Sequence, residues 1–128
     1  MPRSRSETLT DAELRLMEVL WRRGPSTVAE VAAALPKKPK LAYSSVLTTL
    51  RILEQKGYLQ HEERGRAYVY DAVVGRDQAR ASTVRHLLKR FFDDSPGELL
   101  LNVIENEDLN EDELRRVRKL LEETGDDA

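Results

Sequence analysis

A mainly α-helical fold with one small β-hairpin is predicted by three features of the 128-residue sequence. Apolar residues recur at helical spacing in three short segments before residue 58. Two strand-like segments joined by a glycine-containing turn follow within residues 58–71. Beyond Gly75 the pattern is helical again and contains no strand-like segment. This order predicts a helical core carrying a hairpin, followed by a helical arm.

The charge is divided unevenly along the chain. Residues 1–76 contain 13 Lys and Arg against 9 Asp and Glu, whereas residues 77–128 contain 8 against 14. This division favours contact with a polyanion by the first half and another task for the second half. No apolar run approaches the roughly 20 residues of a membrane span, and no apolar segment follows the charged N-terminus as in a signal peptide. We therefore expect a cytoplasmic protein without membrane contact.

Few residues suit catalysis or metal binding. The sequence has no cysteine, which excludes disulfides and thiolate metal sites and fits a reducing compartment. His61 and His86 stand apart from other ligand types, so neither is expected to hold a metal. No nucleophile–base pair, glycine-rich phosphate loop or paired carboxylate motif is found. We expect neither enzymatic activity nor a cofactor.

The first two predicted helices each begin with a capping box. Residues 1–8 are small, polar and basic and are expected to be disordered. A helix is predicted from Thr10 to Arg23, because Thr10 and Glu13 have the spacing of a capping box. The same spacing at Thr27 and Glu30 predicts a second helix over residues 28–35.

The third predicted helix, residues 42–57, has two distinct faces. Its core stripe is expected to consist of Val46, Leu50 and Leu53. The opposite face carries short polar side chains and one guanidinium, without a carboxylate: Ser44, Thr48, Arg51 and Gln55. Such a face suits base edges and phosphates. Gly57 is expected to end this helix in the left-handed conformation.

The spacing of these helices resembles a helix-turn-helix, in which the later helix enters the major groove of DNA. The loop before the third helix contains Lys37, Lys38 and Lys40, which are placed either for phosphate contact or as a solvated linker. The spacing alone has low specificity, because many three-helix units bind no DNA.

The hairpin raises the specificity of this interpretation. Strands are predicted over residues 58–62 and 67–71, with Arg64 and Arg66 in the turn around Gly65. A hairpin directly after a recognition helix is a wing, and its arginines are placed to reach the DNA backbone or a minor groove. The alternative is that these arginines only solubilise the tip. Tyr68 and Tyr70 are expected to cover the core rather than to stack on bases.

We therefore predict a winged helix-turn-helix domain over residues 9–74, a helical dimerisation domain over residues 75–123, and an acidic tail over residues 124–128. The second segment is too small to bury its large apolar residues alone, which favours pairing with another copy. The residues expected in the dimer contact are Val84, Leu87, Leu88, Phe91, Leu100, Leu101, Ile104, Leu114, Val117 and Leu121.

Several motifs resemble the penicillinase-repressor family of bacterial winged-helix regulators (the BlaI/MecI/CopY type). They are LTDAELRLMEVLW at 9–21, STVAEVAAAL at 26–35, LAYSSVLTTLRILEQKGYL at 41–59, GRAYVY at 65–70 and LLLNVIENEDLNEDEL at 99–114. The resemblance implies a homodimer that binds a palindromic operator and represses transcription. The residues that it and the basic loop assign to DNA contact are Lys38, Lys40, Tyr43, Ser44, Ser45, Thr48, Arg51, Arg64 and Arg66.

The sequence departs from the family pattern at one position of this surface. Relatives often carry a basic residue just before the leucine that corresponds to Leu53, whereas this chain has Ile52. The operator sequence therefore does not carry over from the relatives.

The resemblance also implies how such repressors are released. In β-lactam-responsive members a protease cuts within the first dimerisation helix after an asparagine, and the matching bond here joins Asn102 and Val103. The alternative is that this segment only forms dimer core. Copper-responsive members use a C-terminal cysteine cluster, which this cysteine-free chain lacks.

Two other functions stay open from the residues alone. A winged-helix adaptor would bind a partner protein through helix 42–57 or the wing, although interface cores favour aromatic and aliphatic anchors over the short polar side chains found here. A regulator responsive to a small ligand would need a binding site, for which the dimer interface offers a place.

Overall fold

The computed structural model describes residues 8–38 and 41–126. The disorder predicted for residues 1–7 and the contacts predicted for Lys40 lie outside these residues. The chain forms two compact units that divide within a helix, between Leu87 and Leu88.

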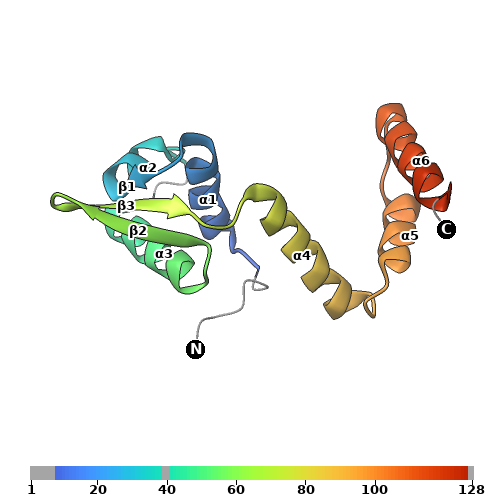
Figure 1. Cartoon of the computed structure of the whole chain (residues 1–128), viewed down its shortest axis with the longest axis horizontal. Coiled ribbons are helices and arrows are strands. Elements are labelled where there is room, and N and C mark those ends of the chain that lie inside the picture. The colour runs from blue at the N-terminus through green and yellow to red at the C-terminus, as the bar shows by residue number, and fades with distance from the viewer. Residues whose placement is uncertain (1–7, 39–40, 127–128) are drawn as a thin grey trace. The chain divides into compact units, whose positions relative to one another are not determined.

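The elements follow one another as helices interrupted by a small sheet (Figure 1). Their order in the first unit is α1 (Asp11–Arg23), β1 (Ser26–Thr27), α2 (Val28–Ala34), α3 (Tyr43–Gln55), β2 (Leu59–Arg64), β3 (Ala67–Ala72) and the start of α4 (Arg76–Phe91). The second unit contains the end of α4, then α5 (Pro96–Asn106) and α6 (Glu111–Asp126). The predicted fold class, mainly α with a small hairpin, is confirmed.

Both predicted capping boxes are present. The backbone N–H of Glu13 donates to the Thr10 hydroxyl at 3.2 Å, and the Glu13 carboxylate accepts from the Thr10 N–H at 2.9 Å. Thr27 and Glu30 repeat the arrangement at the start of α2, with distances of 3.1 and 2.9 Å. These reciprocal bonds satisfy backbone donors that a helix start leaves unpaired.

The sheet differs from the predicted hairpin in one strand and one turn. Its order is β1-β3-β2, because the short strand β1 pairs with Val69 and Tyr70 of β3. Nothing local marks two residues as a strand, so β1 escaped prediction. Arg64, expected in the turn, ends strand β2 opposite Ala67, which leaves Gly65 and Arg66 as the turn. Gly65 has φ 62°, as a tight hairpin turn requires.

The core of the first unit joins the helices to one face of the sheet. Its largest fully buried side chains are Leu16, Met17, Val31, Val46, Leu50, Leu53, Tyr58 and Tyr70. The stripe predicted for α3 is thus entirely buried, which fixes which of its faces is left outside. The Trp21 indole N–H donates to the Val74 carbonyl at 2.9 Å and ties α1 to the segment after β3.

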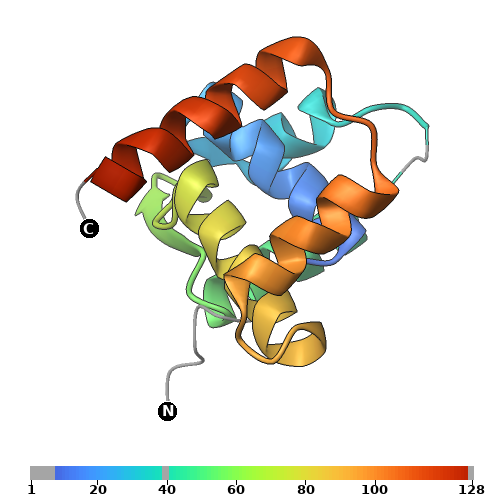
Figure 2. The same cartoon turned by 90° about the vertical axis from the view of Figure 1, so that its right-hand side faces the viewer.

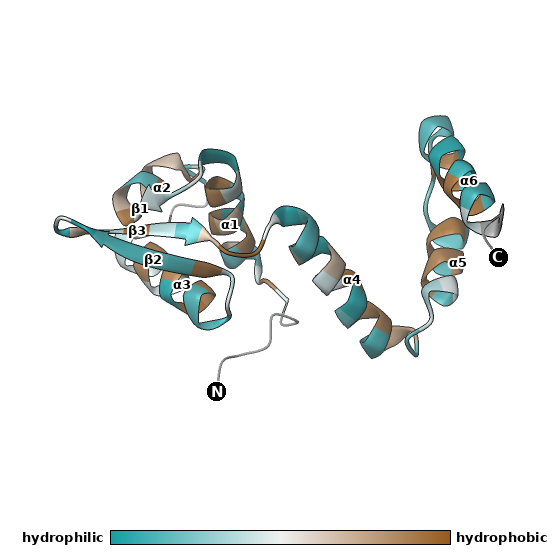
Figure 3. Cartoon of the chain, in the orientation of Figure 1, coloured by the Kyte–Doolittle hydropathy of each residue, from teal (hydrophilic) through white to brown (hydrophobic). Residues whose placement is uncertain are grey.

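The second unit consists of helices with little burial of their own. Within α5 no residue is buried, although Figure 3 shows part of this helix in the brown of apolar residues. Asp93 and Asp94 have positive φ and separate α4 from α5. Figure 2 shows α5 and α6 as two rods joined by residues 107–110. Helix α6 extends to Asp126, so residues 124–126 of the predicted acidic tail are helical.

Candidate nucleic-acid interface

The buried stripe of α3 turns a row of small polar side chains toward solvent. The exposed residues of this row are Tyr43, Ser44, Ser45, Thr48, Arg51 and Gln55. Tyr43 is 57% exposed, an unusual state for a large aromatic ring that nothing in its own domain covers. All five residues predicted on α3 for DNA contact are therefore exposed. We call Tyr43, Ser44, Ser45, Thr48 and Arg51 the recognition face.

The first turn of α3 is electrostatically open to an anion. Its N-cap is Ala42, which makes no side-chain cap, and the first turn has no acidic residue. By contrast, α1 and α2 have threonine caps and acidic first turns. The free N–H groups and the helix dipole at the start of α3 favour a nearby phosphate. Lys38 is exposed in the segment that precedes this turn.

The wing carries its two arginines in different surroundings. Arg66 is exposed in the turn, whereas Arg64 lies on the strand with its Nε 3.8 Å from the Glu62 carboxylate. Side chains alternate along a strand, so Arg64 and Glu62 share the sheet face opposite to that of His61. The structure therefore leaves Arg66 as the unpaired cation of the described turn, while Arg64 is partly neutralised by its neighbour.

The face of the wing that turns toward α3 carries an aromatic residue that was expected in the core. Tyr70 is buried, as predicted, but Tyr68 is 40% exposed and stacks on His61, with ring centroids 4.4 Å apart. The prediction for Tyr68 was wrong because that ring lies two residues nearer the wing tip, beyond the edge of the helical core. Its exposure on the wing, stacked on the His61 ring, makes Tyr68 a candidate that sequence reasoning missed.

Ionisable side chains from α3 and the wing meet at the junction of these two elements. Nδ1 of His61 lies 2.8 and 2.7 Å from the two carboxylate oxygens of Glu54. Burial raises the pKa of the Tyr70 hydroxyl, and the nearby Glu54 carboxylate raises it further, while the Arg51 guanidinium opposes both. Glu54 thus points toward the wing rather than outward with the recognition face.

The apolar residues predicted for dimer contact are largely uncovered within the single chain. Exposure reaches 67% at Phe91, and most of the others are exposed as well: Val84, Leu87, Leu100, Leu101, Ile104, Leu114 and Leu121. Leu88 and Val117 are half-buried. Leu120, which was not predicted, is also exposed. At the predicted cleavage position, Asn102 is exposed and Val103 is half-buried.

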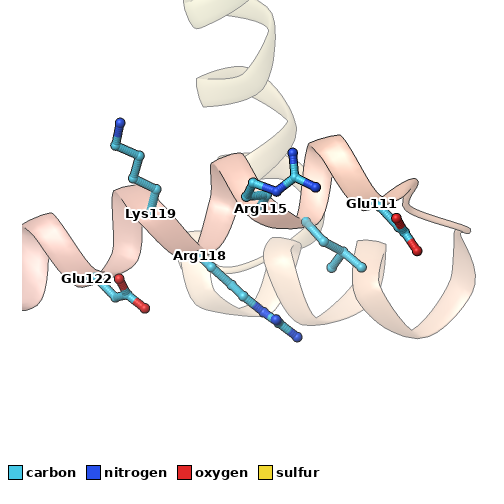
Figure 4. A pocket seen from close by; sticks show the side chains of 6 residues that line it. Glu111, Arg115, Arg118, Lys119 and Glu122 are labelled. Carbon is cyan, nitrogen blue, oxygen red and sulfur yellow. The ribbon is translucent and has the colours of Figure 1, made fainter.

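The basic residues of α6 form no focused surface. A shallow groove of about 480 Å³ on this helix is lined by three cations and flanked by Glu111 and Glu122. Figure 4 shows that Arg118 and Lys119 point in different directions from the helix. Arg115 is 3.1 Å from the Asp112 carboxylate. This mixed surface is typical of a solvated helix face.

Across residues 8–38 and 41–126, no helix is long and apolar enough to cross a membrane. Within the same residues, no three histidine or acidic side chains cluster as a metal site would require.

A three-helix core, an exposed polar third helix and a hairpin directly after it together define a winged-helix DNA-binding domain. A family model described as penicillinase repressor matches residues 9–123. The chain therefore belongs to the penicillinase repressor family.

Two relatives illustrate the similarity. The penicillinase repressor of Bacillus licheniformis is 30% identical over 115 residues, covering 90% of each chain. The transcriptional regulator BlaI of Mycobacterium tuberculosis is 34% identical over 117 residues, covering 89% of this chain and 85% of the relative.

Solved structures match part of the chain. The solution structure of the DNA-binding domain of the repressor BlaI has 31% identity and a TM-score of 0.50, covering 55% of this chain and 85% of its own. Monomeric B. licheniformis BlaI, solved in complex with the blaP half-operator, has 29% identity and a TM-score of 0.50, covering 59% of this chain and 92% of its own.

Proposed function

We propose that this protein is a transcriptional repressor that binds a palindromic DNA operator as a homodimer. The observation that carries the proposal is the recognition face, a row of exposed donors and acceptors on a helix whose other side is anchored in the core. The family match over nearly the whole chain supports the same function. The complex of the related BlaI with a half-operator supports DNA as the ligand.

In this proposal α3 lies in the major groove. The hydroxyls of Ser44, Ser45 and Thr48 exchange hydrogen bonds with base edges and phosphates, and the Arg51 guanidinium reaches an acceptor on a base or the backbone. Tyr43 packs on a thymine methyl or a sugar. Lys38, Lys40 and Arg66 add attraction to the backbone, and Arg64 adds less because it is paired with Glu62.

A second copy of the chain completes the proposal. The exposed apolar residues of α4, α5 and α6 are too many for a stable soluble monomer, and burying each large one contributes about 1.5–3 kcal/mol. A two-fold dimer built on them presents two recognition faces to two half-sites. Occupation of a promoter by this dimer would block transcription.

The first test is fluorescence anisotropy with DNA from upstream of the protein's own gene and with a scrambled fragment, at low and moderate salt. We expect tighter binding to the upstream fragment and weaker binding as salt rises, because counterions are released. The change Arg51→Ala should weaken specific binding by about 1–3 kcal/mol with the fold intact. Equal, weak binding to both fragments would instead favour the protein-partner adaptor.

Release from DNA by proteolysis forms a further part of the proposal. Cleavage between Asn102 and Val103 would remove the last part of α5 and all of α6 from the apolar surface that we assign to the dimer. Intact-mass analysis of the protein from cells exposed to a β-lactam should then reveal a fragment ending at Asn102. An unchanged mass together with induced expression of the target gene would assign this segment to dimer core alone.

A ligand-responsive regulator is a second candidate, favoured by a groove within the first unit. It has a volume of about 460 Å³ and lies between α1 and the start of α4, with Leu14, Trp21 and Val84 in its wall. The Arg76 guanidinium lies 5.3 Å from the centre of the Trp21 ring. The test titrates benzoate into the parent protein and into Val84→Trp and follows Trp21 fluorescence, corrected in the variant for the added indole. Quenching that saturates in the parent and is lost in the variant would support this candidate. Linear quenching in both proteins would reject it for this class of ligand.

A further inference from the structure

His61 connects the wing to the recognition helix. It lies on β2, half-buried, and its Nδ1 is within 2.8 Å of both carboxylate oxygens of Glu54 on α3. Nδ1 can donate to this carboxylate in the neutral ring as well as in the cation. Both side chains are 31% exposed, so the bond is only partly screened by water. The His61–Glu54 bond therefore links β2 to α3 through side chains, in addition to the short chain segment that connects the two elements.

The connection continues toward the wing tip through stacked rings. The Tyr68 ring lies almost parallel to His61, at 21° and 4.4 Å between centroids, and the Tyr70 ring is tilted by 44° with its centroid 5.5 Å from that of His61. Tyr68 pairs with Glu63 and is separated from Arg66 only by Ala67. A partly exposed tyrosine at this position thus supports the turn that carries the unpaired arginine. Figure 1 shows the β2–β3 hairpin extending past α3 to its tip.

The same contacts control a carboxylate next to the proposed DNA surface. Glu54 is on the recognition helix, where an outward-facing carboxylate would repel phosphates. The groups that face His61 are Glu54 and, more distantly, Arg51 from α3, and the two tyrosines from β3. Glu54 is therefore bound to the wing through His61, and the Arg51 guanidinium is close enough to the wing to hydrogen-bond the Tyr70 hydroxyl.

We propose that Glu54, His61 and Tyr68 form a clamp that fixes the angle between the recognition helix and the wing. The clamp allows Arg66 to contact the backbone at the same time as the recognition face engages the groove. His61 is a positioning residue, since it acts through Arg66 and Tyr68 rather than by touching DNA itself. This inference rests on the proposed function, because it concerns how the two parts of one DNA surface act together.

A double-mutant cycle tests the clamp. Affinity for the upstream DNA fragment is measured for the parent protein, Arg66→Ala, His61→Ala and the double variant. A second cycle uses Thr48→Ala in place of Arg66→Ala. Thr48 is the matched control, because it belongs to the recognition face and lies outside the clamp. We expect Arg66→Ala to weaken binding severalfold in the parent and hardly at all when His61 is absent. The coupling should be about fivefold, as for residues in one network, whereas Thr48→Ala should have the same effect in both backgrounds.

The outcomes separate the clamp from the proposed function. Equal effects of Arg66→Ala in both backgrounds, or no effect of it in a parent that binds specifically, would overturn the clamp and leave the repressor intact. The proposed function would instead be overturned if the parent protein bound scrambled DNA as tightly as it binds the upstream fragment and other genomic DNA. If His61→Ala does not fold by circular dichroism, His61→Phe takes its place with the same expectation. That ring can still stack on Tyr68 but cannot bond Glu54.

Discussion

The Glu13–Lys56 pair shows how single residues hold the first unit together. The Lys56 ammonium lies 2.7 Å from the Glu13 carboxylate, and the two side chains are only 11% and 6% exposed. Burial acts to raise the pKa of Glu13, but hydrogen bonds from Lys56 and Thr10 and the Lys56 charge outweigh it and hold that pKa below its ordinary value. The pair joins the start of α1 to the end of α3, so it positions the recognition helix.

Removing one member should leave the other charged and buried. We expect Lys56→Met to destabilise the protein by about 3 kcal/mol, and the double variant Glu13→Gln/Lys56→Met by less. Urea denaturation followed by circular dichroism measures both. A double variant as unstable as Lys56→Met would show that packing of the Lys56 chain, rather than the pair, is lost.

The lowered pKa of Glu13 predicts that the stability of the protein depends on pH. Its pKa in the folded state is lower than the 4.5 of an unperturbed glutamate, so its stabilisation is complete above pH 4.5 and is lost as pH falls through the folded pKa. The stability of Glu13→Gln should therefore fall less than that of the parent protein as the pH drops below 4.5. Urea midpoints of both proteins across that range test this; parallel curves would exclude Glu13 as the cause.

At the scale of elements, the turn between α3 and β2 depends on one glycine. Gly57 has φ 88°, and it allows the chain to leave the recognition helix and enter the wing directly. Tyr58 follows it and is buried, with its N–H donating to the Leu53 carbonyl at 3.0 Å. The relative placement of helix and wing is therefore set at this residue as well as at the clamp.

We expect Gly57→Ala to destabilise the protein by about 1–2 kcal/mol, because a side chain is disfavoured at positive φ. Gly97→Ala is the matched control, since Gly97 lies in the first turn of α5, where an added methyl group would meet only ordinary contacts. Alanine there should be neutral or stabilising by up to about 1 kcal/mol. Thermal unfolding compares the two. Equal destabilisation by both changes would contradict the prediction that the positive φ of Gly57 causes the loss of stability.

At the scale of the whole molecule, the dimer that we propose depends on the exposed apolar residues of α4, α5 and α6. Leu101 is 52% exposed on α5, and the adjacent Asn102 lies on the polar side of the same helix. A carboxylate at position 101 would oppose burial against a second copy, whereas one at position 102 can stay in solvent.

We expect the parent protein to sediment as a dimer, Leu101→Asp as a folded monomer and Asn102→Asp as a dimer. Analytical ultracentrifugation gives the mass of each, and anisotropy on a two-half-site operator should show weaker binding only for Leu101→Asp. A parent that is monomeric at micromolar concentration would contradict the assignment of α4 to α6 to dimer contact.

The sequence by itself determined the features that depend on local spacing. The buried stripe of α3, the capping boxes of α1 and α2 and the hairpin around Gly65 follow from periodicity, hydrogen bonds between near neighbours and backbone preference. The predicted residues of the recognition face are exposed together for the same reason, because the period of a helix fixes which residues share a side.

Only the tertiary structure decided the contacts between distant segments. Strand β1 exists because Ser26 and Thr27 find Tyr70 and Val69 as partners, not because of their own preference. The clamp brings Glu54, His61 and Tyr68 together from three elements, and the register of β2 on β3 separates Arg64 from the α3 side. Such contacts depend on packing and strand register, which local sequence patterns specify weakly.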